Sequence, residues 1–528
     1  MGKNLLNSTN VIEKTIKILF YIIFIYIAIV TLFWNKHDFV QYNCLITVVV
    51  SIITFCFLCF FYSGILNSGR FLRRGIMIPT VCLIIIFIQI IIAHSLYSQI
   101  GWDPKAIYEL ARNYIYDPNS FSYTVFVIYP NNTLLFIAFT IFFKVLNFLN
   151  IQNTLFPLVL LNILMIDITI FITFYLSKKV IGNKLEYVTL IFAGLLILFS
   201  PWITVYYSDT LGMFFPIFII FLYFKINHTM KNGKKYLFSS LLGLVALFGF
   251  LVKPTCIIVL IAISLVEIIT RKKNWLNFFI CTLLCCSIFV GINIVYKMVV
   301  EYSFGEYYTE EEVERLSTPL THFLMMGMQR QDFDDRGSIY GAYFGEDVAL
   351  TQKQPTQQKK VETNFEVIKI RLKKFGVLGY IKFLMDKTNW MFSDGTFYYG
   401  GEGAIFAEPP VTTDTLVSNF FQSFMLRKSK FYNIYANILE GFWMMILILI
   451  AIPFGDKAKI SDKNKIILVM KTTIIGLLLF LLLFEGRSRY LINHLPIFFL
   501  LATISFEGCF NILKNKFHFK RIKSYFNN

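Results

Sequence analysis

Long apolar runs separated by short basic segments dominate the chain. Several runs reach the roughly 20 residues that an α-helix needs to cross a hydrocarbon core about 30 Å thick. Examples are "ILFYIIFIYIAIVTLFW" and "IMIPTVCLIIIFIQIIIAHSL". Segments of about ten residues with alternating apolar and polar positions, typical of membrane β-barrels, are absent from the sequence. The pattern therefore predicts an all-α polytopic membrane protein.

The apolar runs predict a bundle of about 13 transmembrane helices. These are expected near 15–34, 42–63, 76–98, 131–149, 154–177, 186–201, 209–226, 237–252, 254–270, 275–299, 434–454, 464–484 and 490–512. Between the polar loop ending at 130 and the one beginning at 200 lie three apolar segments, whereas a return to the same side needs an even number. One of them, 186–201, is therefore a candidate for a short, re-entrant or interfacial helix.

Basic loops between the runs predict the topology. "GRFLRRG", "KNGKKY" and "RKKNW" are rich in Lys and Arg, and such loops stay in the cytoplasm. The remaining polar segments then share the opposite, external face. They are 99–130, 200–209, the position of Lys253, 301–432 and 485–490.

The spacing of the polar segments divides the chain into five regions. Segment 301–432 is too long for a loop without structure of its own, and an amphipathic helical stretch in it is broken at Gly376. The predicted regions are 1–75 with additional N-terminal helices, 76–300 as the transmembrane core with juxtamembrane helices in its first external loop 99–130, 301–432 with amphipathic helices, 433–513 with C-terminal helices, and 514–528 as a basic cytoplasmic tail.

Composition supports the membrane assignment and excludes other classes. Of 528 residues, 56% are hydrophobic and only 15% are charged, against about 25% in soluble domains. The net charge of +17 lies mainly in the basic loops, which the positive-inside rule explains without a nucleic-acid partner. The nine cysteines lie in apolar runs and lack the spacing of a metal site or a disulfide framework.

The first polar loop holds the strongest candidate for catalysis. In "GWDP", Pro104 suits the first turn of a helix and Asp103 suits its N-cap. A capped interfacial helix explains these residues but not the polar helix that follows, with Glu109 and Arg112 on one face. We therefore expect Asp103 to have a functional role.

Other polar residues are expected on the same face. "VIYPNNT" and "PWITVYYSD" each precede an apolar run. Helix caps and aromatic belts explain every such residue taken singly, but two aspartates on one face suggest a shared site. The candidates in these loops, with one from segment 301–432, are Tyr129, Asn131, Asn132, Tyr207, Asp209 and His322.

Lys253 interrupts an otherwise apolar stretch in "GFLVKPT", and Pro254 is suited to start the next helix. The segment is therefore predicted to form a hairpin with Lys253 at its outward tip. A lysine in the bilayer centre costs about 3 kcal/mol, so its ammonium should reach water or an anionic partner.

"EGRSRY" places Glu485, Arg487, Arg489 and Tyr490 before the last apolar run, on the face where basic residues are not expected. The planar fork of arginine suits phosphate or carboxylate. The two arginines are therefore predicted to hold an anionic ligand, with pairing to Glu485 as the alternative.

The order of these elements resembles the GT-C superfamily of membrane glycosyltransferases, and in particular Gram-positive bacterial members similar to the polyprenyl-phosphate-sugar-dependent mannosyltransferase and aminoarabinose transferase families. The elements that carry the resemblance are "YPNN" at 129–132, "PW…YSD" at 201–209, "KPT" at 253–255, Thr321 to Asp347, and "DGTF" at 394–397. The resemblance implies a GT-C-like bundle that transfers a sugar from a polyprenyl-phosphate or diphosphate carrier to a glycan, glycolipid or protein acceptor at the external face of the cell membrane.

The resemblance also implies roles for the candidate residues. Asp103 would be the base, with Asp209 assisting, and Lys253, Arg487 and Arg489 would stabilise the leaving phosphate. Pro104 stands where the family often has a second acidic residue, which leaves a divalent cation, Mg²⁺ or Mn²⁺ at Asp103, as an open alternative. Contacts to donor or acceptor would come from Tyr129, Asn131, Asn132, Tyr207, His322, Glu485 and Tyr490. A transporter or flippase of lipid-linked sugars, and a polysaccharide polymerase or ligase, are the alternative functions.

Overall fold

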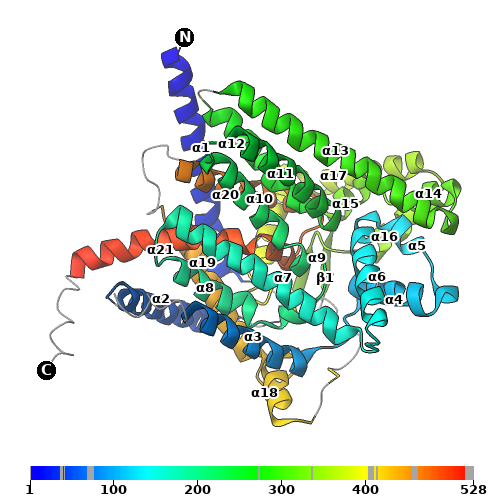
Figure 1. The fold of residues 1–528 in the computed structure, drawn as a ribbon, viewed down its shortest axis with the longest axis horizontal. Helices are drawn as coiled ribbons and strands as arrows, with labels where there is room; N and C mark the ends of the chain where they lie inside the picture. The colour runs from blue at the N-terminus through cyan, green and yellow to red at the C-terminus, as the bar shows by residue number, and fades with distance from the viewer. Residues whose placement is uncertain are drawn as a thin grey trace.

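A computed structural model describes residues 2–35, 40, 42–67, 77–271, 274–333, 337–401, 410–411, 414–453 and 462–517. In these residues, 11 helices are long and apolar enough to cross a membrane. They are α1 (Gly2–Phe33), α2 (Cys44–Asn67), α3 (Met77–Leu96), α6 (Thr133–Phe148), α7 (Leu155–Leu176), α10 (Phe214–His228), α11 (Asn232–Val252), α13 (Trp275–Phe304), α19 (Tyr432–Ala451), α20 (Asp462–Leu483) and α21 (Leu495–Phe517). Figure 1 shows these helices in one bundle.

Two of the predicted spans are shorter than the others. The apolar helical segments Glu186–Leu198 and Pro254–Thr270 reach about 20 and 25 Å at 1.5 Å per residue. The first comprises α8 (Glu186–Ala193) and the π-helical η5 (Gly194–Leu198), and the second comprises η7 (Pro254–Ile257) and α12 (Ile258–Thr270). The all-α membrane class is confirmed, and the segment with the uneven span count is indeed short.

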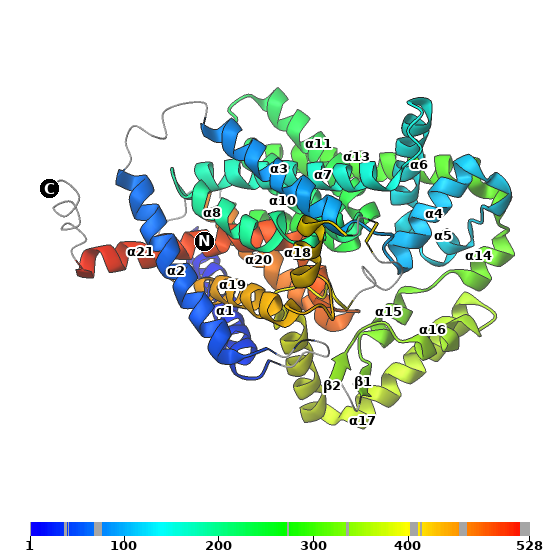
Figure 2. The same cartoon turned by 90° about the horizontal axis from the view of Figure 1, so that it is seen from below.

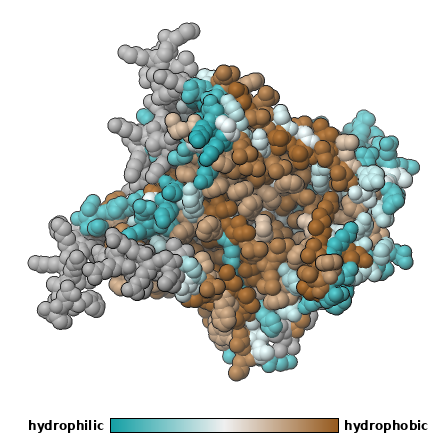
Figure 3. Space-filling model, viewed as in Figure 1, coloured by the Kyte–Doolittle hydropathy of each residue, from teal (hydrophilic) through white to brown (hydrophobic). Residues whose placement is uncertain are grey.

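A broad apolar belt surrounds the bundle. Figure 3 shows it as a brown zone between hydrophilic groups at opposite ends. The belt consists of exposed Leu, Ile, Val and Phe side chains on the peripheral helices, for example Phe60 and Leu83. Since no water is present in the core of a bilayer, such side chains can face lipid without exposing apolar surface to water. The belt therefore marks the membrane-facing surface.

The helices differ in how deeply they are enclosed. In α21 78% of the most apolar window is buried, against 6% in α13, so α21 is central and α13 peripheral. Helices α1 and α2 pack against α19. Ser51 on α2 donates a hydrogen bond to the carbonyl of Gly441 on α19 at 2.8 Å. The two N-terminal helices thus belong to the same bundle as the rest.

Polar helices cover one end of the bundle. They are α4 (Trp102–Tyr116), α5 (Thr124–Ile128), α14 (Glu310–Leu316), α15 (Leu320–Met326), α16 (Gly345–Gln352) and α17 (Gln357–Phe392). We call these helices and the hairpin among them the polar cap. Figure 2 shows the cap on one side, with α14 beside α5. Helix α14 is acidic, and a capping box between Thr309 and Glu312 closes its N-terminal end.

Two features of the cap bear on the predictions. Gly376 breaks α17 as expected, because it takes a φ of 62° that costs glycine little. Strands β1 (Arg330–Phe333) and β2 (Gly337–Tyr340) form an antiparallel hairpin with Gln331 opposite Ile339. The all-α prediction omitted this hairpin. The amphipathic α18 (Leu416–Met425) lies against α3.

Short irregular helices join the cap to the bundle. They are η2 (Pro118–Ser120), η3 (Pro130–Asn132), η6 (Pro201–Thr204), α9 (Ser208–Leu211), η8 (Gly305–Tyr307) and η9 (Ser488–His494), whereas η4 (Ser177–Ile181) continues α7 at its other end. Most of the residues predicted to form a site lie on these segments or beside them. Residues 518–528 of the predicted basic tail lie outside the described residues, and α21 ends at Phe517.

Candidate functional site

Residues from four distant parts of the chain meet beneath the polar cap. Asp103 comes from α4, Asp209 from α9, Lys253 from the connection between α11 and η7, and Arg489 from η9. We call the whole group the site cluster. Its members are Asp103, Tyr207, Asp209, Lys253, Glu485, Arg487, Arg489 and Tyr490.

Asp103 is not the N-cap of its helix, contrary to the prediction. The helix begins at Trp102, one residue before Asp103. Its N-cap is Gly101, and no side-chain hydrogen bond caps this end of the helix. Asp103 therefore lies in the first turn, and its Oδ2 accepts a hydrogen bond from the hydroxyl of Tyr207 at 2.9 Å. Because the carboxylate is not used for capping, it faces residues 104 positions away in the chain.

Tyr207 connects the first polar loop to the rest of the site cluster. Its hydroxyl lies 2.9 Å from Asp103 and 3.4 Å from the side-chain oxygen of Asn132. Burial raises the pKa of Tyr207 well above its usual value, and the charge of Asp103 raises it further. The phenol therefore stays protonated and acts as a hydrogen-bond donor to Asp103.

Asp209 is fully buried and has a cation at each carboxylate oxygen. Its Oδ1 forms an ion pair with the ammonium of Lys253, and its Oδ2 lies 3.5 Å from Nη1 of Arg489. A buried carboxylate requires such compensation. The structure thus confirms that Lys253 stands at the tip of a helical hairpin, and identifies Asp209 as its anionic partner.

Aromatic rings surround these cations. The ring centre of Tyr490 lies 4.4 Å from the Lys253 ammonium and 5.2 Å from the Arg489 guanidinium, and Tyr207 lies 5.7 Å from the same guanidinium. The electron-rich faces of the rings stabilise cations that have lost water. The positive charges are thereby held in place at the membrane boundary.

Glu485 lies beside the second arginine. It accepts a hydrogen bond from the Tyr490 hydroxyl at 2.9 Å, and the Nε of Arg487 lies 3.6 Å away. Arg487 also lies over the ring of Tyr398 at 5.6 Å. Burial raises the pKa of Glu485, Arg489 and Tyr490 oppose the rise, and the charge of Asp103 adds to it. The predicted alternative, pairing of an arginine with Glu485, is present for Arg487.

The remaining predicted residues separate into two groups. Asn132 accepts hydrogen bonds from Tyr207 and from Asn131 at 3.3 Å. Burial raises the pKa of Tyr129 to about 12, with contributions from Tyr343 and then from the charges of Asp103 and Glu485. Tyr129, Asn131 and Asn132 therefore border the site cluster.

His322 belongs instead to the core of the polar cap. It is buried, and its Nδ1 lies 2.8 Å from the hydroxyl of Thr351, which donates in turn to Asn364 at 2.9 Å. Burial lowers the pKa of His322 to about 4. None of the described hydrogen-bond partners of His322 belongs to the site cluster.

Two supporting residues were missed in the sequence. The side chain of Asn493 donates to the carbonyls of Ser208 and Asp209 at 2.8 and 3.0 Å, which ties η9 to α9. Lys387 donates to the carbonyls of Gly327, Leu482 and Phe484 at 2.8, 3.1 and 2.6 Å. Asn493 follows the "SRY" element by three positions, which was a usable signal, whereas nothing local marks Lys387.

Gly341 explains how the "EGR" turn is fixed. It has a φ of 62°, and a Cβ there would meet the Cε of Lys387 at 2.4 Å. Its carbonyl accepts a hydrogen bond from the amide of Gly486 at 2.9 Å. The polar cap therefore holds Glu485 and Arg487 against the bundle through backbone contacts.

The "DGTF" turn supports the same region from behind. Asp394 is fully buried and accepts hydrogen bonds from Tyr42 at 2.7 Å, from Thr396 at 2.6 Å and from Ser488 at 3.0 Å. Ser488 lies next to Arg487 and Arg489 in the sequence. Asp394 thus anchors the segment that carries the two arginines.

A divalent cation does not fit the donor set around Asp209, since both of its oxygens face cationic side chains. Among the residues that the structure describes, no group of three His, Cys, Asp or Glu side chains is arranged to hold a metal ion. At Asp103, the position predicted for such a cation, the described partner of the carboxylate is the Tyr207 hydroxyl.

Comparison with known proteins gives a family. No curated protein and no solved structure matches the chain. The family described as "Conserved hypothetical integral membrane protein" matches residues 8–510, which is nearly the whole sequence. Its description agrees with the multi-pass bundle and assigns no activity. The chain belongs to this family of integral membrane proteins.

Proposed function

We propose that the protein is a membrane glycosyltransferase that moves a sugar from a polyprenyl-phosphate or diphosphate carrier to an acceptor at the external face of the cell membrane. One observation carries the proposal. The carboxylate of Asp103 and the guanidinium of Arg489 both contact Tyr207, at opposite parts of one side chain. A basic group therefore stands at the hydroxyl, and a cation for a leaving phosphate over the ring, of a single phenol.

The chemistry requires both groups. Asp103 accepts the proton of the acceptor hydroxyl while the hydroxyl oxygen attacks the anomeric carbon of the sugar. The bond from that carbon to the phosphate oxygen breaks, and the electron pair leaves with the phosphate. Arg489, Arg487 and Lys253 stabilise the negative charge that develops there, because preorganised cations cost little to reorganise during the reaction.

Asp209 has a different role in this mechanism from the one implied by the family resemblance. Both of its oxygens face cations, so it is poorly placed to accept a further proton. We assign it as a positioning residue that keeps Lys253 and Arg489 at a fixed distance from each other. Its own negative charge also limits the repulsion between those two cations.

The position of the site cluster at the end of the bundle suits a substrate with a lipid tail. The apolar belt of Figure 3 ends next to the polar groups. A carrier lipid can keep its isoprenoid chain in the bilayer while its phosphate reaches the cations. This requirement also explains why charged residues stand beside the ends of α11 and α20.

The test is sugar transfer by the purified protein in nanodiscs, with radiolabelled polyprenyl-phosphate sugars as donors and a panel of glycan, glycolipid and peptide acceptors. Asp103→Asn is expected to lower the rate about 10²- to 10⁴-fold, the usual contribution of a general base. The asparagine keeps an oxygen for Tyr207, so folding should be preserved. Asp117→Asn is the matched control, because Asp117 is an exposed aspartate of the same loop.

Two results contradict the proposal. Equal rates for wild type, Asp103→Asn and Asp117→Asn would remove Asp103 from the mechanism. Movement of the intact carrier lipid between leaflets, without cleavage of the sugar–phosphate bond, would identify a flippase instead.

A further inference from the structure

A separate pocket lies at the opposite end of the bundle, which carries the basic loops. It contains about 940 Å³ of space between the ends of α10, α11, α12 and α13, counting its open mouth. The space open to a water-sized sphere is about 190 Å³, less than most sites that enclose a whole small ligand, so the pocket can hold part of a larger molecule. None of the site cluster residues lines it.

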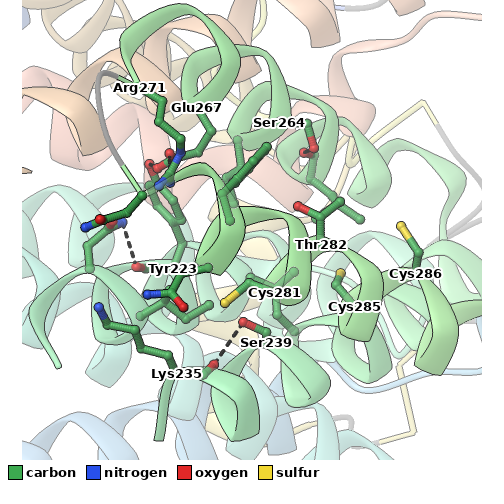
Figure 4. A pocket seen from close by; sticks show the side chains of 18 residues that line it. Tyr223, Lys235, Ser239, Ser264, Glu267, Arg271, Cys281, Thr282, Cys285 and Cys286 are labelled. Atoms are coloured by element: carbon green, nitrogen blue, oxygen red, sulfur yellow. Dashed lines mark hydrogen bonds and ion pairs between the residues drawn. The ribbon is translucent and has the colours of Figure 1, made fainter. Parts of the chain in front are cut away.

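The polarity of the pocket changes with depth. Figure 4 shows Lys235, Glu267 and Arg271 on one side and Ser264, Cys285 and Cys286 on the other. Lys235 lies in the basic stretch "KNGKKY", and Arg271 is the first residue of "RKKNW". On α13 the lining runs from Asn277 to Cys286, a depth of about 14 Å. The mouth is charged and the interior is apolar or weakly polar.

The charges at the mouth favour an anion. Glu267 is satisfied by Arg271, by Lys465 at 2.7 Å and by the hydroxyl of Tyr223. Its single negative charge is therefore outweighed by the two cations that contact it, and Lys235 adds a further positive charge. The buried Nε of Arg271 has no hydrogen-bond partner in the described part of the chain.

The wall formed by α13 opens toward lipid. A Cβ on Gly243 of α11 would meet the carbonyl oxygen of Cys285 at 2.2 Å, so these two helices pack in close contact. Outside this contact, α13 is the least buried of the described spans. Cys286 on α13 is exposed at the surface and also lines the pocket. A hydrocarbon chain can thus pass between the pocket and the bilayer.

We infer that this pocket binds a phosphate-bearing amphiphile, with its phosphate at Lys235 and Arg271 and its hydrocarbon chain along the deeper wall of α13. Basic pockets between transmembrane helices commonly hold anionic lipid head groups. The site is independent of sugar transfer and stands whether or not the proposed activity is found. Its occupant would fill the gap between α12 and α13.

The experiment is a titration of the purified full-length protein in detergent with phosphatidylglycerol, followed by native mass spectrometry. Phosphatidylcholine, which carries no net charge, is the comparison lipid, and glycerol phosphate is the soluble comparison. We expect saturable binding of one phosphatidylglycerol, at least tenfold weaker binding of phosphatidylcholine, and no displacement by glycerol phosphate at equal concentration.

Three variants test the location. Lys235→Gln should weaken phosphatidylglycerol binding about fivefold, the effect of one basic residue near a membrane surface. Lys234→Gln, at the exposed neighbouring lysine that does not line the pocket, should leave it unchanged. Ser264→Phe should weaken phosphatidylglycerol binding at least tenfold, because the larger side chain fills the pocket. The variant should fold, because the only described hydrogen bond of the Ser264 side chain is within its own helix.

Several outcomes would overturn the inference. Equal binding of both lipids would show that no anionic head group is recognised. Displacement by glycerol phosphate would show a site for soluble phosphate, and equal effects of Lys234→Gln and Lys235→Gln would place binding on the general basic surface. The melting temperature of each variant identifies any that fail to fold, and Lys235→Gln, which breaks no described side-chain contact, keeps the test decisive.

Discussion

Two clusters of buried charges occupy opposite ends of the bundle, and their construction differs. At the basic-loop end, Glu267 accepts from Lys465 at 2.7 Å and also contacts Arg271 and the Tyr223 hydroxyl. Glu267, Lys465 and Tyr223 all lie on regular helices, and Arg271 directly follows α12. The group joins α10, α12 and α20, so a structural role accounts for Glu267, while Arg271 also faces the pocket.

The site cluster at the other end is built from irregular backbone. Asp209 lies on a four-residue helix, Lys253 in an extended connection and Arg489 in a 3-10 helix. Asp103 accepts from the Tyr207 hydroxyl, whereas Glu485 accepts from the Tyr490 hydroxyl and also lies 3.6 Å from the Nε of Arg487. Buried charge by itself therefore does not distinguish a site. The irregular segments that carry Asp209, Lys253 and Arg489, and the hydrogen bond of Asp103 to a tyrosine rather than to a cation, do so better.

The largest effect is expected when the structural group loses its carboxylate. Glu267→Ala leaves two cations that contacted it without compensation, and breaking a buried ion pair in this way costs about 3–5 kcal/mol. Chemical unfolding in detergent measures this loss, while transfer per folded molecule should stay unchanged. A fall in transfer with unaltered stability would erase the distinction between the two groups.

Arg489→Lys tests the opposite expectation in the site cluster. The lysine retains a positive charge for Asp209 but loses the planar fork that matches a phosphate. The rate of transfer should fall about 10²- to 10³-fold, as when one donor to a developing anion is removed. Stability should fall less than in Glu267→Ala, because the lysine keeps a positive charge beside the buried Asp209. Arg330→Lys in the exposed hairpin is the control, and an equal loss there would show a non-specific effect.

The bundle and several of its local features were predictable from the sequence. Length and apolar content identify a span, because a helix that crosses the bilayer needs about 20 mostly apolar residues of its own. Pro254 and Lys253 indicated the hairpin, and the broken helix at Gly376 followed from glycine alone. Segment 186–201 was recognised as anomalous from the span count, although its length of 13 helical residues needed the structure.

The partners within the site were not predictable, because they depend on tertiary contacts. Asp103 fits an N-cap by sequence, yet the actual N-cap is Gly101. Lys253 had to find an anion, but the choice of Asp209, 44 positions away, is set by the packing of α10 against α11. His322 looked like a site residue because a loop histidine carries no local sign of burial.

His322 provides a test of that last distinction. Its folded-state pKa is about 4, below the ordinary value of 6.5, so the unfolded chain takes up the proton first as pH falls. The stabilising contribution is complete above pH 6.5 and is lost as pH falls toward 4, by about 3 kcal/mol. His322→Asn should remove this slope in chemical unfolding curves.

The same variant separates a core histidine from a site residue. At pH 7.5 transfer by His322→Asn should match the wild type, since His322 bonds to Thr351 and not to the site cluster. A loss of transfer at that pH without a loss of stability would return His322 to the substrate-binding residues.

The smallest effect is expected from Tyr207→Phe, which keeps the ring beside Arg489 and removes only the hydroxyl that donates to Asp103. A hydrogen bond to a charged group contributes about 1.5–3 kcal/mol, so kcat/KM should fall about 10- to 150-fold. If the hydroxyl acts by orienting Asp103, adding Tyr207→Phe to Asp103→Asn should cause little further loss, because coupled residues are not additive. Full additivity in this double-mutant cycle would mean that Tyr207 contacts the substrate by itself. Its hydrogen bond to Asp103 would then not be the contact that organises the site cluster.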